Sequence, residues 1–162
     1  MLFVRRLDWL VGRLIDAAGW LVLPVIVLLF LQWPLRDLVH GYSRDANDLG
    51  QWIFALYVAC SVTAATRAGT HLAADILAQR YSPQTRGRLK KFGALFGLLP
   101  WALFVLIGGR NIVLSSLLAR ERFPDTNNPG YFVIKLALWI MAILILAQVI
   151  IDLLRPSHKD AP

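Results

Sequence analysis

The chain has 162 residues, of which 57% are hydrophobic and only 17% are charged, and its mean hydropathy is +0.58. About a quarter of the residues in a soluble globular domain are charged, so this composition excludes such a domain and indicates an all-α integral membrane protein. The net charge of +7 does not indicate nucleic acid as a partner, because the Lys and Arg residues flank apolar segments and form no separate polar surface.

Uncharged apolar segments predict four transmembrane helices within a single integral membrane domain, residues 1–162. A helix needs about 20 apolar residues to cross the hydrocarbon core of a bilayer. An amphipathic lead-in at residues 3–16 precedes the first span, which we expect at about 17–35. Pro24 should kink that span, because proline has no backbone N–H. The other three spans are expected at about 49–66, 92–114 and 131–153.

A polar interval at residues 64–91 separates the first pair of spans from the second. Leu72 and Ile76 fall on one helical face, and His71, Asp75 and Gln79 fall on another. This pattern predicts an amphipathic interfacial arm helix at about 68–80, between spans two and three. The basic residues that follow predict contact with anionic lipid headgroups. They are Arg86, Arg88, Lys90 and Lys91.

The distribution of Lys and Arg among the loops predicts the orientation of the chain. The N-terminal segment and the central interval hold most of the basic residues, whereas the loops at 36–48 and 120–130 hold two each. Because basic residues accumulate on the cytoplasmic side, we expect both termini in the cytoplasm and these two loops outside.

Small residues recur every fourth position in two of the spans, where they allow helix backbones to approach closely. In the second span they are Ala55, Ala59 and Thr63, and in the third they are Gly93 and Gly97. We interpret both sets as helix-packing faces.

The residue types needed for catalysis or cofactor binding do not gather on one side of the predicted membrane. No carboxylate falls inside an apolar run between residues 17 and 151, and His40, His71 and His158 lie in loops or at interfaces. Arg67, His71 and Asp75 form a row with too few ligands for a metal ion. We therefore expect no enzyme, no metal site and no cofactor in this chain. A self-sufficient ion-coupled transporter usually holds an acidic group at the membrane midplane, so an accessory subunit fits these residues better than a small exporter or a cofactor-binding membrane anchor.

A motif near the centre of the chain resembles a known family. The run Arg67-Ala-Gly69-Thr-His71-Leu72-Ala-Ala-Asp75, after a span that opens with Asn47-Asp48-Leu49-Gly-Gln-Trp52, resembles the small membrane subunit (DctQ type) of tripartite ATP-independent periplasmic (TRAP) transporters. The resemblance covers nearly the whole chain. Asp48 stands where many members have Glu. The resemblance implies that the matching residues Asn47, Arg67, Gly69, His71 and Asp75 position the arm helix.

The resemblance also implies a function and partners. In such systems the small subunit looks like a scaffold that braces a large elevator-type subunit during sodium-coupled uptake of an organic acid, which a periplasmic binding protein delivers. Sodium is then expected in the large subunit, and the chain is expected in the bacterial inner membrane, in contact with phospholipids. Candidate residues for docking the binding protein lie in the two external loops. They are Arg36, Arg44, Asp45, Arg120, Arg122 and Asp125. A stand-alone four-span membrane protein remains the alternative.

Overall fold

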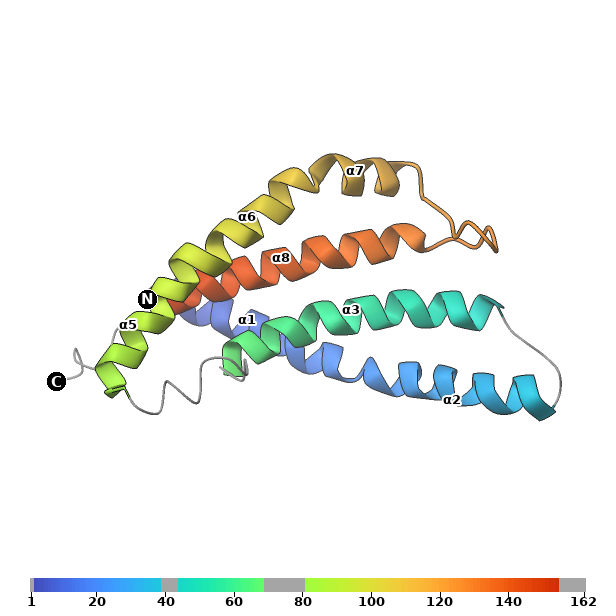
Figure 1. The fold of residues 1–162 in the computed structure, drawn as a ribbon, viewed down its shortest axis with the longest axis horizontal. Helices are drawn as coiled ribbons and strands as arrows, with labels where there is room; N and C mark the ends of the chain where they lie inside the picture. Colours follow the sequence, from blue (N-terminus) through green and yellow to red (C-terminus); the bar gives the residue numbers. More distant parts are fainter. Residues whose placement is uncertain (1, 39–43, 69–80, 155–162) are drawn as a thin grey trace.

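The fold is an elongated bundle of α-helices in a computed structural model, which describes residues 2–38, 44–68 and 81–154 (Figure 1). The chain begins with α1 (Leu2–Gly19), α2 (Val22–Leu38) and α3 (Arg44–Ala68). A second group follows. It consists of α5 (Pro83–Gly93), the π-helical turn η1 (Ala94–Leu98), α6 (Leu99–Gly108), α7 (Arg110–Leu118) and α8 (Tyr131–Leu154). In a bilayer a helix satisfies its own backbone hydrogen bonds, which is why apolar segments adopt this structure.

Four helical segments of the described chain are long and apolar enough to cross a membrane. They are Leu2–Pro34, Arg44–Ala68, Gln84–Gly108 and Tyr131–Leu154. The all-helical class is therefore confirmed, and the number of candidate spans agrees with the four predicted from the sequence. The predicted arm helix at 68–80 lies almost wholly outside the described residues, since α3 ends at Ala68. The cytoplasmic location of both termini stays a prediction.

Helix α8 is the central helix of the bundle, and it contacts α1, α3, α6 and α7. Figure 1 shows it between α6 on one side and α3 on the other. Ala94, Ala102, Ile145 and Val149 form a core cluster where η1 and α6 meet α8. The outer faces are different, because large apolar side chains such as Phe30 and Phe104 are exposed there. Such faces are typical of helices that lie against lipid or against another membrane subunit.

Two prolines explain the breaks in the long helices. Pro24 cannot donate a hydrogen bond to the carbonyl of Trp20, and Leu23 N–H donates to that carbonyl instead, at 3.2 Å. The helix is interrupted just before Pro24, between α1 and α2, which agrees with the kink predicted there. Pro100 follows the π-helical turn, in which Leu99 N–H donates to the carbonyl of Ala94. Inserted π turns of this kind bend helices.

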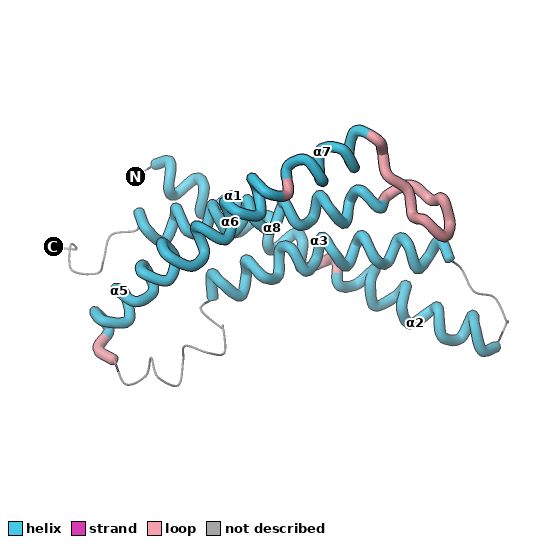
Figure 2. The backbone as a smooth tube through the Cα atoms, turned by 45° about the horizontal axis from the view of Figure 1, so that its top comes forward, coloured by secondary structure: helices cyan, strands magenta, loops and turns pink. Residues whose placement is uncertain are grey.

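The helical segment that contains the third span begins earlier than the expected start at about 92. It starts at Pro83, where Ser82 caps the helix by accepting a hydrogen bond from Thr85 N–H at 3.3 Å. Proline suits the first helical position, because its missing N–H would have no helical partner there. At the other end Gly109 separates α6 from α7, which continues to Leu118. Figure 2 shows α7 leading into the loop at 119–130 beside the start of α3. We call this end of the bundle the loop end.

Candidate functional site

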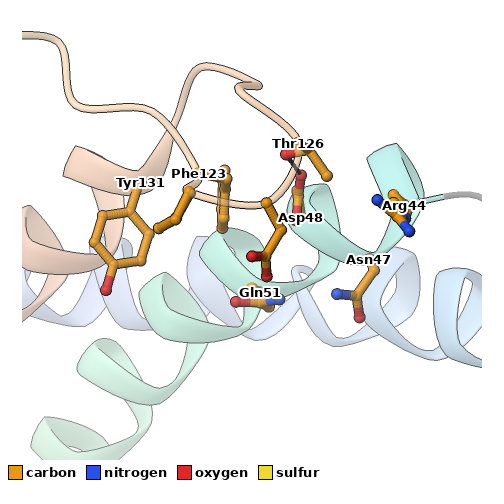
Figure 3. A pocket seen from close by; sticks show the side chains of 9 residues that line it. Arg44, Asn47, Asp48, Gln51, Phe123, Thr126 and Tyr131 are labelled. Carbon is orange, nitrogen blue, oxygen red and sulfur yellow. Dashed lines mark hydrogen bonds between the residues drawn. The ribbon is translucent and has the colours of Figure 1, made fainter.

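A polar cleft of about 560 Å³ lies at the loop end. It lies between the first two turns of α3 and the 119–130 loop (Figure 3). Its lining comes from residues of α3, from the loop and from the first residue of α8. These residues are Arg44, Asn47, Asp48, Gln51, Phe123, Pro124, Asp125, Thr126 and Tyr131.

Asp48 joins the two walls of the cleft. Its side chain is buried, with 7% of the residue exposed. The Thr126 hydroxyl donates a hydrogen bond to Asp48 Oδ2, and Asn128 Nδ2 donates a second one at 3.1 Å. Asn128 Nδ2 also donates to Asp45. A buried carboxylate needs such donors, because burying a charge without them is costly. The two loop residues therefore fix the loop on the N-terminal end of α3.

The loop has a backbone shape that its sequence explains. Phe123 N–H donates to the carbonyl of Asn128, and Asn127 N–H donates to the carbonyl of Phe123, both at 2.9 Å. Asn127 has a φ of 58° and Gly130 a φ of 122°. Asn and Gly are the residues that adopt positive φ most readily. At Gly130 a Cβ atom would also lie 3.3 Å from the Trp52 ring.

Some of the candidate docking residues lie at this cleft. Arg44 and Asp125 line it and are exposed, and Asp45 is exposed while bonded to Asn128. Arg120 and Arg122 are exposed on the loop, where Arg122 Nη1 donates to the carbonyl of Asn127 at 3.1 Å. Arg36 lies near the end of α2. An open polar cleft with exposed charges of both signs can bind a charged protein surface.

A second polar cluster joins the loop to α8. Lys135 Nζ lies 2.5 Å from Glu121 Oε2, and Ser116 of α7 donates a hydrogen bond to the same oxygen. The hydrogen bond from Lys135 is the main cause that holds the pKa of Glu121 below its ordinary value of 4.5, and the bond from Ser116 adds to it. The cluster connects α7, the loop and α8 at one point.

The residues that match the family motif are not gathered at one site. Asn47 lines the loop-end cleft, whereas Arg67 lies in the last turn of α3, near the other end of that helix. Arg67 Nη2 lies 2.7 Å from Asp8 Oδ1, and Arg67 Nη1 donates to the carbonyl of Asp8 at 3.3 Å. Arg67 thereby connects α3 to α1. Gly69, His71 and Asp75 lie outside the described residues.

The two predicted packing faces have different surroundings. In α3, Ala59 and Thr63 are buried in the bundle, with 3% and 0% exposed, and Ala55 is half-buried. Gly93 and Gly97 are exposed, and a Cβ atom at either position would meet nothing within 4 Å. The glycines therefore make no close helix contact within the described chain, and their packing against another subunit stays a prediction.

The four residues predicted to contact lipid headgroups all lie in α5, and Arg86, Arg88 and Lys90 are exposed. Lys90 also has a partner in the chain, because its Nζ atom lies 3.4 Å from Asp152 Oδ2. Gln148 Nε2 donates to the other oxygen of Asp152 at 3.1 Å. This contact connects α5 to the end of α8.

Sequence reasoning missed each of these long-range pairs. Asp48 lies 78 residues from Thr126 and Asp8 lies 59 residues from Arg67. One signal was available in both cases: an acidic and a polar or basic residue at ends of predicted spans that share one side of the membrane. That signal narrows the choice of partners but does not select a pair.

The fold and these polar ends define a multi-pass helical membrane protein. The family model of tripartite ATP-independent periplasmic transporters, DctQ component, matches residues 25–158. The chain therefore belongs to the DctQ family and is a small permease subunit of a TRAP transporter. This family is a family of transporter components and not of enzymes. No curated protein and no solved structure matches the chain.

Proposed function

We propose that this chain is a scaffold subunit, which braces a large elevator-type subunit in the bacterial inner membrane during sodium-coupled uptake of an organic acid. Membership of the DctQ family carries this proposal. The outward apolar faces of α2 and α6 support it, because a subunit that lies between lipid and a larger partner needs apolar surface on both sides.

The positions of the acidic residues support the assignment of transport to another chain. Among the described acidic residues outside the first span, Asp48, Glu121 and Asp152 lie at or near the ends of the other spans, and each is bonded to neighbouring side chains. Groups that bind coupling ions are expected near the middle of a membrane. The sodium and substrate sites therefore belong to the large subunit in this proposal, and this chain holds no cofactor.

The loop-end cleft is the proposed contact for the periplasmic binding protein. Arg44 and Asp125 line the cleft from opposite walls, and Arg122 lies beside it. Exposed charges of both signs favour a polar, reversible contact, as a protein that must release its substrate and dissociate requires. The motif residues from Asn47 to Asp75 are proposed to position the arm helix. Arg67 contributes by pairing with Asp8, which holds the end of α3 against α1.

Co-purification and uptake test the proposed function. The tagged chain is co-expressed with the large subunit, and the complex is reconstituted in vesicles with the binding protein. We expect the large subunit to co-purify, and we expect uptake to need both membrane chains, the binding protein and a sodium gradient. Each membrane chain reconstituted alone is the control. Uptake by this chain alone would instead support a stand-alone small exporter.

A further inference from the structure

A second polar cavity, of about 360 Å³, lies between α1 and the last turn of α3, at the end of the bundle opposite the loop end (Figure 1). Its lining residues are Arg5, Asp8, Trp9, Gly12, Arg13, Asp16 and Arg67. Those from α1 recur at intervals of three or four positions, so they share one face of that helix. The volume falls within the range of ligand-binding cavities, about 300–1,000 Å³.

Gly12 leaves the space at the middle of this face. A Cβ atom at Gly12 would lie 3.7 Å from Nη2 of Arg67. The same nitrogen lies 2.7 Å from Asp8 Oδ1, and the two side chains are only 32% and 27% exposed. The ion pair of Arg67 and Asp8 therefore forms a fixed floor, and no side chain at position 12 covers it.

The charges around the cavity are not balanced. Three guanidinium groups and two carboxylates line it, an excess of one positive charge. Arg67 is paired with Asp8, whereas Arg5 and Arg13 make no hydrogen bond or ion pair with any residue that the structure describes. The Arg13 guanidinium lies over the Trp9 ring, 5.4 Å from its centroid. Guanidinium groups bind phosphate oxygens in pairs, so the free donors favour an oxyanion with one negative charge.

The cavity lies at the level of the lipid headgroups. Arg67 directly follows the uncharged residues 49–66 of α3, whose length suffices to cross the hydrocarbon core. The first candidate span, Leu2–Pro34, has 33 residues, more than a crossing requires, and its charged residues all precede position 17. Trp9 is 62% exposed, as is typical of tryptophan at the membrane interface. Headgroups are therefore beside this cavity whenever the chain is in a bilayer.

Apolar surface adjoins the polar cavity. Leu10 and Leu14 follow Trp9 and Arg13 by one position on α1, and they are 49% and 47% exposed. Phe3, on the same side of the helix as these leucines, is 68% exposed. A phospholipid needs this combination, because its phosphate requires cationic donors while its acyl chains require apolar contacts close by. A soluble phosphate compound has no use for the apolar part.

We propose that this cavity binds the phosphate group of a net anionic phospholipid such as phosphatidylglycerol, with Arg5 and Arg13 as donors. One negative charge balances the excess positive charge, whereas the ammonium group of a zwitterionic lipid leaves it unbalanced. Because the floor joins α1 to α3, a bound lipid stabilises that contact. The inference does not depend on the scaffold function, and no residue of α5 lines the cavity.

Lipid titration of the full chain tests the inference. The tagged chain is purified in mild detergent, and bound lipid is counted by native mass spectrometry after addition of phosphatidylglycerol or of phosphatidylcholine with the same acyl chains. Wild type should bind phosphatidylglycerol more tightly. Arg5→Gln and Arg13→Gln should each weaken this binding by about tenfold, as expected for loss of a hydrogen bond between charged groups.

Arg6→Gln is the matched control. It removes the same charge from an exposed position of the same helix, but Arg6 does not line the cavity. This variant should bind phosphatidylglycerol like wild type. Gly12→Leu keeps every charge and fills the cavity, so it should also weaken binding. The melting temperature of each variant without lipid measures folding, and the replacements of Arg5 and Arg13 should leave it unchanged because both residues are exposed.

Four results would overturn the inference. Equal affinity of wild type for the two lipids would remove the preference for an anionic headgroup. Equal weakening by Arg6→Gln and Arg13→Gln would show that only the net charge of α1 matters. Displacement of phosphatidylglycerol by an equal concentration of inorganic phosphate would identify a free phosphate as the ligand. Cross-linking of Arg13→Cys to the large subunit, in a Cys60→Ser background, would show that a protein covers the cavity.

Discussion

At the loop end, residues that line the same cleft differ in how many contacts they make with the rest of the chain. Asp48 is buried and accepts hydrogen bonds from two residues of the 119–130 loop. Asp125 lines the same cleft but is exposed, and no hydrogen bond to a described residue involves it. Two carboxylates in one cleft therefore have different roles, because only one of them has donors around it.

Replacement of Asp48 should detach the loop from α3. Asp48→Ala leaves the Thr126 hydroxyl and the Asn128 amide without their acceptor, and we expect the free energy of unfolding to fall by about 1–3 kcal/mol. Limited proteolysis in the 119–130 loop should become faster. Asp125→Ala is the control and should change neither quantity. Equal protease resistance in wild type and Asp48→Ala would contradict the assigned role.

Glu121 should make stability depend on pH. Its pKa lies below the ordinary value of 4.5, chiefly because Lys135 donates a hydrogen bond to it. A carboxyl with a lowered pKa contributes stability above the pKa of the unfolded chain and loses it as the pH falls through the folded value. The melting temperature of wild type should therefore exceed that of Glu121→Gln at neutral pH, and the two melting temperatures should converge below pH 4.5. A constant difference across this range would argue against the ion pair as the cause.

At the scale of elements, the spacing of small residues had different consequences in two helices. On α3 the row that includes Ala59 and Thr63 is buried against other helices of the chain, whereas Gly93 and Gly97 at the start of the third span are exposed. The spacing is the same, so spacing alone does not say which helix will cover the face. Burial of α3 follows from its position beside the central helix α8.

Enlarging the buried side chain of Thr63 should destabilise the chain itself. Thr63 is fully buried, and Thr63→Leu adds volume where no space exists, which typically costs about 1–3 kcal/mol. The melting temperature of the purified chain measures this effect. Ala68→Leu is the control, because Ala68 is exposed on the same helix. An unchanged melting temperature for Thr63→Leu would show that the bundle does not close around this position.

At the scale of the whole molecule, the two ends of the bundle are held by polar contacts and the middle by apolar packing. Asp48 and Glu121 fix the loop end, and Asp8 and Asp152 pair with basic residues of α3 and α5. Between them, the core cluster around Ala102 and Ile145 is apolar. This division suits a bilayer, because charged pairs cost least near the headgroups.

The sequence by itself determined the helical class, the four spans and the family. These features depend on the order of apolar and polar residues along the chain, because a bilayer requires long uncharged helices whose backbone groups bond internally. The kink at Pro24 was predictable for the same reason, since a missing N–H is a local property. The candidate docking residues were predictable only as members of two loops.

The tertiary structure alone decided which side chains meet. Asp48 with Asn128, Asp8 with Arg67 and Lys90 with Asp152 are pairs separated by 80, 59 and 62 residues. In the same structure Arg110 is exposed, whereas Lys135 forms an ion pair with Glu121. Such contacts depend on how the helices are rotated and tilted against one another, and packing between whole helices sets that geometry. Helical periodicity says which residues share a face, but not which face they will meet.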